Sequence, residues 1–291
     1  MKEKKFDPLT IKAVAFDLDG TLLRPDKTVS ERSLRVLRSC LKKGIHLIIT
    51  TGRALASGEK YRELIGMGGP HVYYNGAEVA DVSAGKIIYT KFVDPQPILY
   101  CVRLARQMGL YYQVFFPAGT VNVPCRDGQN SGEILMAERV TTEAEMYVKS
   151  TNIEVTAGDL EEQLAKVPAV IKGMFITSEE DHIKLRSLLR DRYGDSIYIA
   201  QSSPIFLEVL ASGVSKGAGL SHALEYLNLK PENTIAFGDE ENDLPMFETA
   251  GFSAAPANAK EEVRNAATFQ IPANTEDGIA VFLEERFNLG S

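Results

Sequence analysis

Short apolar runs alternate with segments of helical spacing at both ends of the chain. An apolar run at 11–16 predicts a buried strand, and leucines share one helical face over 30–43. The alternation continues in the N-terminal part with a strand at 46–50, a helix at 54–65 and a strand at 71–74, which ends in an Asn75-Gly76 turn. It returns near the C-terminus with helices at 215–227, 244–250 and 278–287 and strands at 234–237 and 266–271. Strands that alternate with helices over short connections predict a parallel sheet with right-handed crossovers.

The middle of the chain has a looser pattern. Strands of antiparallel type are predicted at 86–93, 111–116 and 121–125, with further strands at 171–177 and 196–200 and helices at 99–108, 160–167 and 179–193. The fold class is therefore α/β, a Rossmann-like doubly wound parallel sheet core with an inserted α+β cap domain. We expect residues 1–83 and 213–291 to form the discontinuous core and residues 84–212 to form the cap.

Composition and charge narrow the function classes. The 291 residues carry 32 Lys+Arg and 39 Asp+Glu, a formal charge of −7 without a basic block, so we expect no nucleic acid partner. The three cysteines Cys40, Cys101 and Cys125 are too widely spaced for a disulfide framework or a zinc site. Neither a signal core nor an apolar stretch of about 20 residues is present, which favours a cytoplasmic protein with no membrane partner. The oligomeric state is left open.

Two acidic loops follow apolar strands. Asp17 and Asp19 stand two residues apart in Asp17-Leu18-Asp19-Gly20-Thr21, so on extended backbone they point the same way and repel each other unless a cation lies between them. Asp239 and Asp243 follow the strand at 234–237, and strands of one open sheet present their loops at the same edge. Oxygen ligands without His or Cys suit a hard cation, most commonly Mg²⁺. Taken singly, the first loop also fits a plain turn and the second a solvated helix cap.

Two further features suggest phosphate binding. Thr51 and Gly52 follow a predicted strand, where a hydroxyl and loop N–H groups before a helix can hold a phosphate. Lys216 opens a helix, where the dipole disfavours a cation unless an anion lies nearby. Ordinary turn chemistry and an exposed surface lysine are the alternatives.

These four features, in this order, resemble the motifs of the haloacid dehalogenase (HAD) superfamily of phosphohydrolases. The chain is similar to the Cof-type branch, which carries a type IIB cap, in the segments 16–23, 51–53, 74–77, 215–217, 238–243 and 274–280. One departure is the segment 255–259, Ala-Pro-Ala-Asn-Ala, where the branch usually has a Met-Gly-Asn-Ala turn. That turn is not catalytic, so the departure concerns local geometry.

The resemblance implies a role for each motif residue. Asp17 is the expected nucleophile, and Asp19 the acid that protonates the leaving oxygen and then the base that activates water. Asp17, the Asp19 backbone carbonyl and Asp239 are the expected metal ligands, with Asp243 acting through its contacts or through water. The expected phosphate-binding groups are Leu18 (backbone N–H), Thr51, Gly52 (backbone N–H), Lys216 and Asn242. Arg53 and Asn75 are candidates for substrate binding or for bracing loops.

The implied function is a Mg²⁺-dependent phosphatase of small phosphorylated metabolites, with an aspartyl-phosphate intermediate. Sugar phosphates are the first expectation, followed by pyridoxal or flavin phosphates. The cap is expected to close over the site and to determine substrate choice. One alternative is a phosphomutase on the same scaffold, which would form an isomerised ester rather than free phosphate. The other is a non-catalytic phospholigand-binding regulator, which would release no phosphate.

Overall fold

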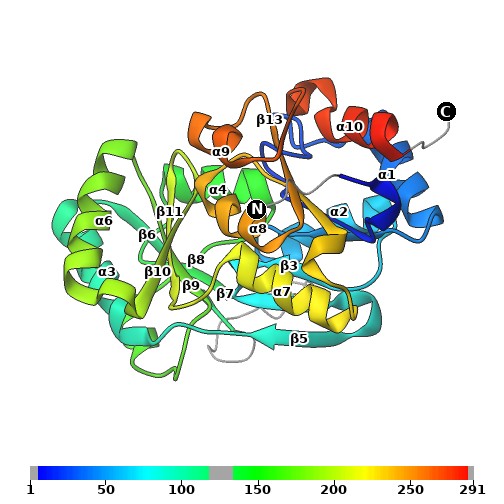
Figure 1. Cartoon of the computed structure of the whole chain (residues 1–291). Coiled ribbons are helices and arrows are strands. Elements are labelled where there is room, and N and C mark those ends of the chain that lie inside the picture. The colour runs from blue at the N-terminus through cyan, green and yellow to red at the C-terminus, as the bar shows by residue number, and fades with distance from the viewer. Residues whose placement is uncertain (1–5, 118–133, 288–291) are drawn as a thin grey trace. The chain divides into compact units, whose positions relative to one another are not determined.

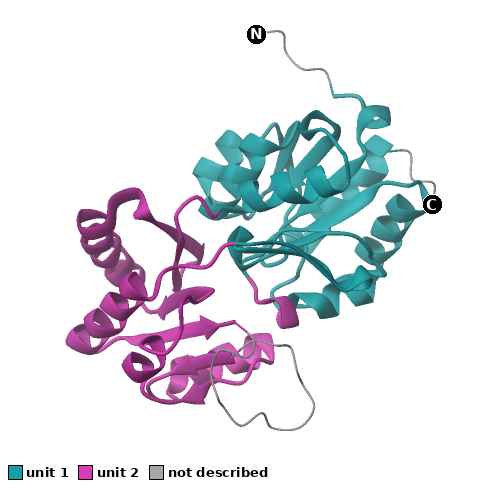
Figure 2. Cartoon of the chain, turned by 90° about the horizontal axis from the view of Figure 1, so that it is seen from below, with its two compact units in different colours: residues 1–52, 58–90, 215–291 teal, residues 53–57, 91–214 magenta. Residues whose placement is uncertain are grey.

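The computed structural model describes residues 6–117 and 134–287 (Figure 1). The chain divides into two compact units, shown in separate colours in Figure 2. Unit 1 comprises Met1–Gly52, Gly58–Thr90 and Ser215–Ser291, and unit 2 comprises Arg53–Ser57 and Lys91–Val214. The strand predicted at 121–125, and Cys125 with it, lie outside the described residues.

Unit 1 contains the predicted parallel sheet. Its five strands lie in the order β14 (Phe269–Ile271), β13 (Phe252–Pro256), β12 (Thr234–Phe237), β1 (Ala13–Phe16) and β2 (His46–Ile49). Every neighbouring pair is parallel. The chain runs from β1 outward to β2 and later returns to β12 on the other side of β1. The switch in strand order therefore falls between β1 and β12, where ligands bind in open α/β sheets.

Helices cover both faces of this sheet because the residues of β1 alternate between two apolar clusters. Val14 and Phe16 pack in one cluster with Leu37 and Leu283. Ala13 and Ala15 lie in the other, with residues of the helices that follow Ser215. The helices are α1 (Glu31–Lys42), α2 (Leu55–Ile65), α7 (Lys216–Tyr226), α8 (Leu244–Thr249), α9 (Glu261–Ala266) and α10 (Gly278–Phe287). The predicted doubly wound α/β core is thus confirmed.

The expectation for residues 71–74 was wrong in one respect. β3 (His71–Tyr73) has only an isolated bridge, between Thr50 and Val72, as its backbone pairing with the parallel sheet. It otherwise pairs antiparallel with β4 (Glu78–Asp81), which pairs with β5 (Lys86–Thr90). The Asn75-Gly76 turn is responsible. Its positive φ angles, 57° and 99°, reverse the chain and return β4 onto β3. Residues 84–90, which the sequence analysis placed in the cap, lie in unit 1 because β5 pairs with β4.

Unit 2 contains a six-stranded mixed sheet. Its strands lie in the order β10 (Ile197–Ser203), β11 (Phe206–Ala211), β9 (Lys172–Ile176), β6 (Tyr111–Phe116), β7 (Ile134–Ala137) and β8 (Thr156–Ala157). Its helices are α3 (Pro95–Met108), α4 (Thr142–Thr151), α5 (Leu160–Leu164) and α6 (Glu179–Tyr193). The predicted separate α+β block is confirmed, with the expected bounds for β6 and α6. The sequence analysis missed four elements here, β7, β8, β11 and α4, and in unit 1 it missed β4, β13 and α9.

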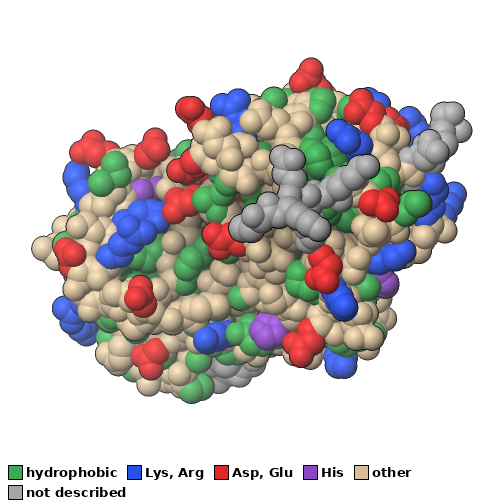
Figure 3. Space-filling view, viewed as in Figure 1, with side chains coloured by type: hydrophobic (Ala, Val, Ile, Leu, Met, Phe, Trp, Pro, Cys, Tyr) green, Lys and Arg blue, Asp and Glu red, His purple; other side chains and the backbone are tan. Residues whose placement is uncertain are grey.

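Two observations concern the protein's surroundings. In the described parts of the chain, every helix is too short or too polar to cross a membrane. On the face seen in Figure 3, the described basic and acidic side chains are interspersed over the surface.

Candidate active site

The register of the parallel strands brings the candidate motifs to one edge of unit 1. Phe16, the last residue of β1, lies opposite Phe237 of β12 and Ile49 of β2. The next residue, Asp17, donates its N–H to the Phe237 carbonyl at 2.9 Å. Thr50 and Thr51 directly follow the last residue of β2. The loops after three neighbouring strands therefore begin at the same level of the sheet.

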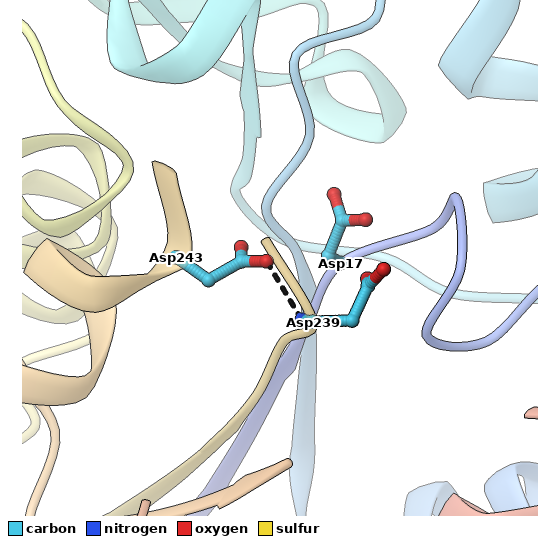
Figure 4. Close-up of side chains that lie close together, drawn as sticks. All are labelled: Asp17, Asp239 and Asp243. Carbon is cyan, nitrogen blue, oxygen red and sulfur yellow. Dashed lines mark hydrogen bonds between the residues drawn. The ribbon is translucent and has the colours of Figure 1, made fainter. Parts of the chain in front are cut away.

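Three buried carboxylates meet at this edge. Asp17, Asp239 and Asp243 each place one oxygen within 4.8 Å of the others (Figure 4). All three side chains supply only oxygen, the donor atom that hard divalent cations prefer. This group could hold a metal ion.

Lys216 lies between two of these carboxylates. Its Nζ donates to Asp17 Oδ1 at 2.7 Å and to Asp243 Oδ1 at 2.6 Å, and its side chain is 2% exposed. Helix α7 can begin here because the Ser215 hydroxyl accepts the N–H of Ala218 at 3.0 Å. The lysine at this helix start has the anionic partners that its unfavourable position suggested.

Asp243 shapes the loop that carries Asp239. Its Oδ2 accepts the backbone N–H groups of Asp239 at 2.9 Å and of Glu240 at 3.1 Å. A Cβ on Gly238 would lie 2.4 Å from the Cβ of Asp243, so this close turn requires glycine. One oxygen of Asp243 thus holds its own loop while the other accepts from Lys216.

The electrostatics of this cluster favour a bound cation. Burial raises the pKa of Asp17 to about 7, with Lys216 opposing the rise and Asp243 and Asp19 adding to it. Burial, together with the charges of Asp17 and Asp243, holds the pKa of Asp239 well above its usual range. Burial alone would lower the pKa of Lys216, but the two carboxylates it contacts outweigh that effect and raise it. The cluster holds three carboxylates and one lysine, which contacts two of them, so the donor set fits a divalent cation.

Thr21 also belongs to this cluster, although the sequence analysis gave it no role. Its hydroxyl donates to Asp239 Oδ1 at 2.5 Å. Gly20 makes this approach possible, because its φ is +80° and a Cβ there would lie 2.1 Å from Asp239 Oδ2. The signal was present in the sequence, since Thr21 is the last residue of the Asp-x-Asp-x-Thr motif.

Asp19 lies outside the three-carboxylate group. Its Oδ1 accepts a hydrogen bond from Lys27 Nζ at 2.7 Å, and its side chain is 30% exposed. Lys27 was not expected here, and no spacing in the sequence indicates it. Leu18 between the two aspartates is buried, and its carbonyl accepts the N–H groups of Leu22 and Leu23. The two aspartates of the motif therefore have different surroundings, one buried and one half-exposed.

The candidate phosphate-binding residues form a second cluster. The Thr51 carbonyl accepts the N–H of Asn75 at 2.9 Å, and Asn242 Nδ2 donates to Asn75 Oδ1 at 2.8 Å. A Cβ on Gly52 would lie 3.0 Å from Asn75 Oδ1, so Gly52 is immediately beside that amide. Asn242 precedes Asp243 and thereby joins this cluster to the carboxylates. Arg53 is buried but groups with unit 2.

Comparisons with known proteins agree with this geometry. The family model of haloacid dehalogenase-like hydrolases matches residues 14–283. A 5-amino-6-(5-phospho-D-ribitylamino)uracil phosphatase of Bacillus subtilis (strain 168) is 32% identical over 281 residues, 95% of this chain and 97% of the relative. A pyridoxal phosphate phosphatase of Escherichia coli (strain K12) is 27% identical over 282 residues, 94% of this chain and 98% of the relative. The solved structure of an HAD subclass IIB sugar phosphatase has a TM-score of 0.76 at 22% identity, covering 96% of this chain and 100% of that one, a likeness of fold.

The match over nearly the whole chain identifies the class of protein. The chain belongs to the haloacid dehalogenase-like hydrolases. The expected membership of the Cof-type branch is confirmed, and so is the expected enzyme class, a phosphoric monoester hydrolase.

Proposed function

We propose that the protein is a Mg²⁺-dependent phosphatase that hydrolyses small phosphorylated metabolites through an aspartyl-phosphate on Asp17. One observation carries the proposal: Asp17 lies at the carboxyl end of β1, buried beside Asp239 and Asp243 and hydrogen-bonded to Lys216. A carboxylate in this position can act as a nucleophile, and the surrounding charges offset those of a phosphate.

The first half-reaction transfers the phosphoryl group to Asp17. An oxygen of its carboxylate attacks phosphorus, the bond from phosphorus to the ester oxygen breaks, and Asp19 supplies the proton that the leaving alkoxide takes up. In the second half-reaction the Asp19 carboxylate removes a proton from water, whose oxygen attacks the acyl phosphate. Phosphate leaves, and both aspartates return to their starting states. The half-exposed position of Asp19 suits this role, because leaving group and water must both reach it.

Charge that develops on the phosphoryl oxygens needs donors fixed in advance. Lys216 is one, since it is already held by two carboxylates. Thr51, the Gly52 and Leu18 N–H groups and Asn242 are the others that we assign. The contacts among Thr51, Gly52, Asn75 and Asn242 support the assignment, because they hold these groups in one cluster before any ligand binds. In this assignment Asn75 braces Thr51 and Asn242 through its hydrogen bonds, and Arg53 binds the substrate.

Asp17, the Asp19 carbonyl and Asp239 would hold the metal ion, with Asp243 supporting them through its hydrogen bonds. Bound Mg²⁺ would neutralise the carboxylates and the phosphate ester and would keep Asp17 ionised near neutral pH.

The proposed substrates are small phosphate esters on a polyol or sugar, followed by pyridoxal phosphate. A relative at 32% identity acts on a phosphorylated ribityl compound, and one at 27% identity acts on pyridoxal phosphate, which supports this order. We propose unit 2 as the cap that selects among these esters, because the carboxylates, Lys216, Thr51 and Gly52 all lie in unit 1.

A phosphate-release screen tests the proposal. The panel contains sugar phosphates, 5-amino-6-(5-phospho-D-ribitylamino)uracil, pyridoxal phosphate and flavin mononucleotide, each with Mg²⁺ and with EDTA. We expect Mg²⁺-dependent release of phosphate from at least one class, and complete loss of release in Asp17→Asn with an unchanged circular dichroism spectrum.

Three results would contradict the proposal. Isomerised ester without free phosphate would indicate a phosphomutase. Ligand binding without any turnover would indicate a regulator. Activity of Asp17→Asn within about tenfold of the wild type would remove Asp17 from the nucleophile position.

A further inference from the structure

Two asparagines from the C-terminal part of unit 1 tie down the loop that follows the proposed nucleophile. Asn258 Nδ2 donates to the Gly20 carbonyl at 2.8 Å, and Asn274 Nδ2 donates to the Leu23 carbonyl at 2.7 Å. The two asparagines are also joined to each other, because the Asn274 N–H donates to Asn258 Oδ1 at 2.9 Å. A continuous chain of hydrogen bonds thus connects the segment after β13 and the segment after β14 to residues 17–24.

The two anchored carbonyls, those of Gly20 and Leu23, belong to a tight turn over residues 18–23. Within it, the Leu18 carbonyl accepts the N–H groups of Leu22 and Leu23 at 3.1 and 2.8 Å. Gly20 has a φ of +80°, a conformation that glycine adopts without steric cost. Asn258 fixes the Gly20 peptide at its carbonyl, and the Thr21 side chain on its far side donates to Asp239. The turn is therefore held from outside at Gly20 and at Leu23.

We propose that Asn258 and Asn274 are positioning residues for the reaction, which set the turn that carries Asp19 against Asp17 and Asp239. The inference rests on the proposed function, since Asp19 must reach both leaving group and water while Asp17 attacks. Neither asparagine touches the reacting atoms; each acts through the backbone of residues 18–23. The segment 255–259 thereby gains a role, because Asn258 is its residue that reaches the loop.

A purely structural role is the competing explanation, and the chain offers a matched control. Asn233 Nδ2 donates to the Thr10 carbonyl at 2.8 Å, the same kind of bond at the same length, also at an exposed position of unit 1. Asn233→Ala therefore removes an equivalent hydrogen bond away from the carboxylates. We expect Asn233→Ala to lower Tm by about 2–4 °C and Asn258→Ala to lower it by at least that amount, because Asn258 Oδ1 also accepts the Asn274 N–H.

Kinetics with Mg²⁺ and p-nitrophenyl phosphate separate the two explanations. We expect Asn258→Ala and Asn274→Ala each to lower kcat by about 10- to 100-fold with KM changed by less than about threefold, because misplaced catalytic groups slow chemistry more than binding. Asn233→Ala should keep the wild-type kcat. In the double variant Asn258→Ala/Asn274→Ala, the fold-loss in kcat should be smaller than the product of the two single fold-losses, because the two residues are hydrogen-bonded to each other and hold the same loop. A kcat loss that Asn233→Ala shares, or losses that multiply, would overturn the proposal.

Hydrogen exchange of the metal-free protein supplies a readout that needs no turnover. Amides of residues 18–24 should exchange at least about fivefold faster in Asn258→Ala and Asn274→Ala than in Asn233→Ala. Unchanged exchange would overturn the positioning proposal even if the wild type is an active phosphatase. A wild type that releases no phosphate would defeat the proposed function instead, and the exchange data would still decide whether the asparagines hold the loop.

Discussion

Lys216 and Asp17 form a buried ion pair of 2.7 Å at the centre of the carboxylate group, with side chains that are 2% and 8% exposed. The same ammonium group also contacts Asp243, whose side chain is fully buried. A buried carboxylate without a partner costs several kcal/mol, so the lysine permits the cluster to fold and opposes the rise that burial causes in the pKa of Asp17.

Replacing Lys216 should therefore damage stability and activity together. We expect Lys216→Met to lower the free energy of unfolding by about 3–5 kcal/mol in EDTA, because two buried carboxylates lose their cation. Phosphatase activity should fall by at least about 100-fold, since a donor to the phosphoryl group is lost. Urea denaturation and initial rates measure the two effects.

Lys260 provides the control for that variant. Its Nζ lies 2.9 Å from Glu240 Oε2, with side chains that are 34% and 16% exposed. Lys260→Met should cost less than about 1 kcal/mol, as partly exposed pairs contribute little. Equal losses in the two variants would show that the burial of Lys216 has no special energetic consequence.

The carboxylates should also couple metal binding to pH. Burial raises the pKa of Asp17 from 3.8 to about 7, so the folded metal-free protein binds more protons than the unfolded chain between these values. Its stability should therefore fall as pH rises from about 4 to about 7. Mg²⁺ replaces these protons, so the increase in Tm that it produces should be larger at about pH 8 than at about pH 6. Differential scanning fluorimetry with Mg²⁺ and EDTA measures both Tm values. In Asp17→Asn the Mg²⁺-induced increase in Tm should depend less on pH. A Mg²⁺-induced increase in Tm that is the same at both pH values in the wild type would contradict the coupling.

His71 should give the opposite dependence on pH. It is fully buried, its Nδ1 accepts the Ile49 N–H at 3.2 Å, and burial, reinforced by Arg62 and opposed by Asp81, lowers its pKa from 6.5 to about 3. The unfolded chain then binds the extra proton, so stability is complete above about pH 6.5 and is lost as pH falls toward 3.

His71→Asn keeps an acceptor for Ile49 and does not titrate. Urea denaturation between about pH 6 and pH 4 should therefore show a slope shallower by up to about 1.4 kcal/mol per pH unit. A slope unchanged in His71→Asn would remove His71 as its source.

The pattern of apolar residues was enough to predict that the two acidic loops meet, because their meeting depends only on where the strands end. Asp17 and Asp239 each follow an apolar strand, and parallel strands of one sheet end at the same edge. The contacts that refine the site could not be predicted in this way. The bonds from Lys27 to Asp19 and from Asn258 to Gly20 join segments whose spacing carries no signal, since they depend on how loops pack.

Two of the missed strands, β11 and β13, have a physical explanation as well. Glu208 interrupts the apolar pattern of β11. It is buried and accepts a hydrogen bond from Lys172 Nζ at 2.5 Å. β13 contains Ser253, whose hydroxyl accepts the Thr268 N–H at 3.1 Å. A polar residue that finds its partner only in the folded protein looks, in the sequence, like the end of a strand.

Unit 2 should determine which ester is hydrolysed. We expect a chimera in which the corresponding segment of a curated relative replaces residues 91–214 to change the ranking of substrates while it still hydrolyses p-nitrophenyl phosphate, because the carboxylates and Lys216 stay in unit 1. Asp17→Asn in the chimera is the control and should abolish all turnover. A folded chimera that keeps the original ranking would mean that unit 1 selects the substrate.

The two aspartates of the first motif should differ in the step that they control. Asp19→Asn leaves the nucleophile Asp17 in place but removes both the proton donor and the base. p-Nitrophenolate leaves without protonation, so with p-nitrophenyl phosphate the first half-reaction should proceed, while hydrolysis of the aspartyl-phosphate slows by roughly 100- to 10,000-fold. Rapid-quench kinetics should therefore show a burst of p-nitrophenol and an acid-stable phosphoprotein, both absent in Asp17→Asn. A linear trace without phosphoprotein in Asp19→Asn would mean that Asp19 is not the base for hydrolysis, because loss of that base must make the second half-reaction limiting.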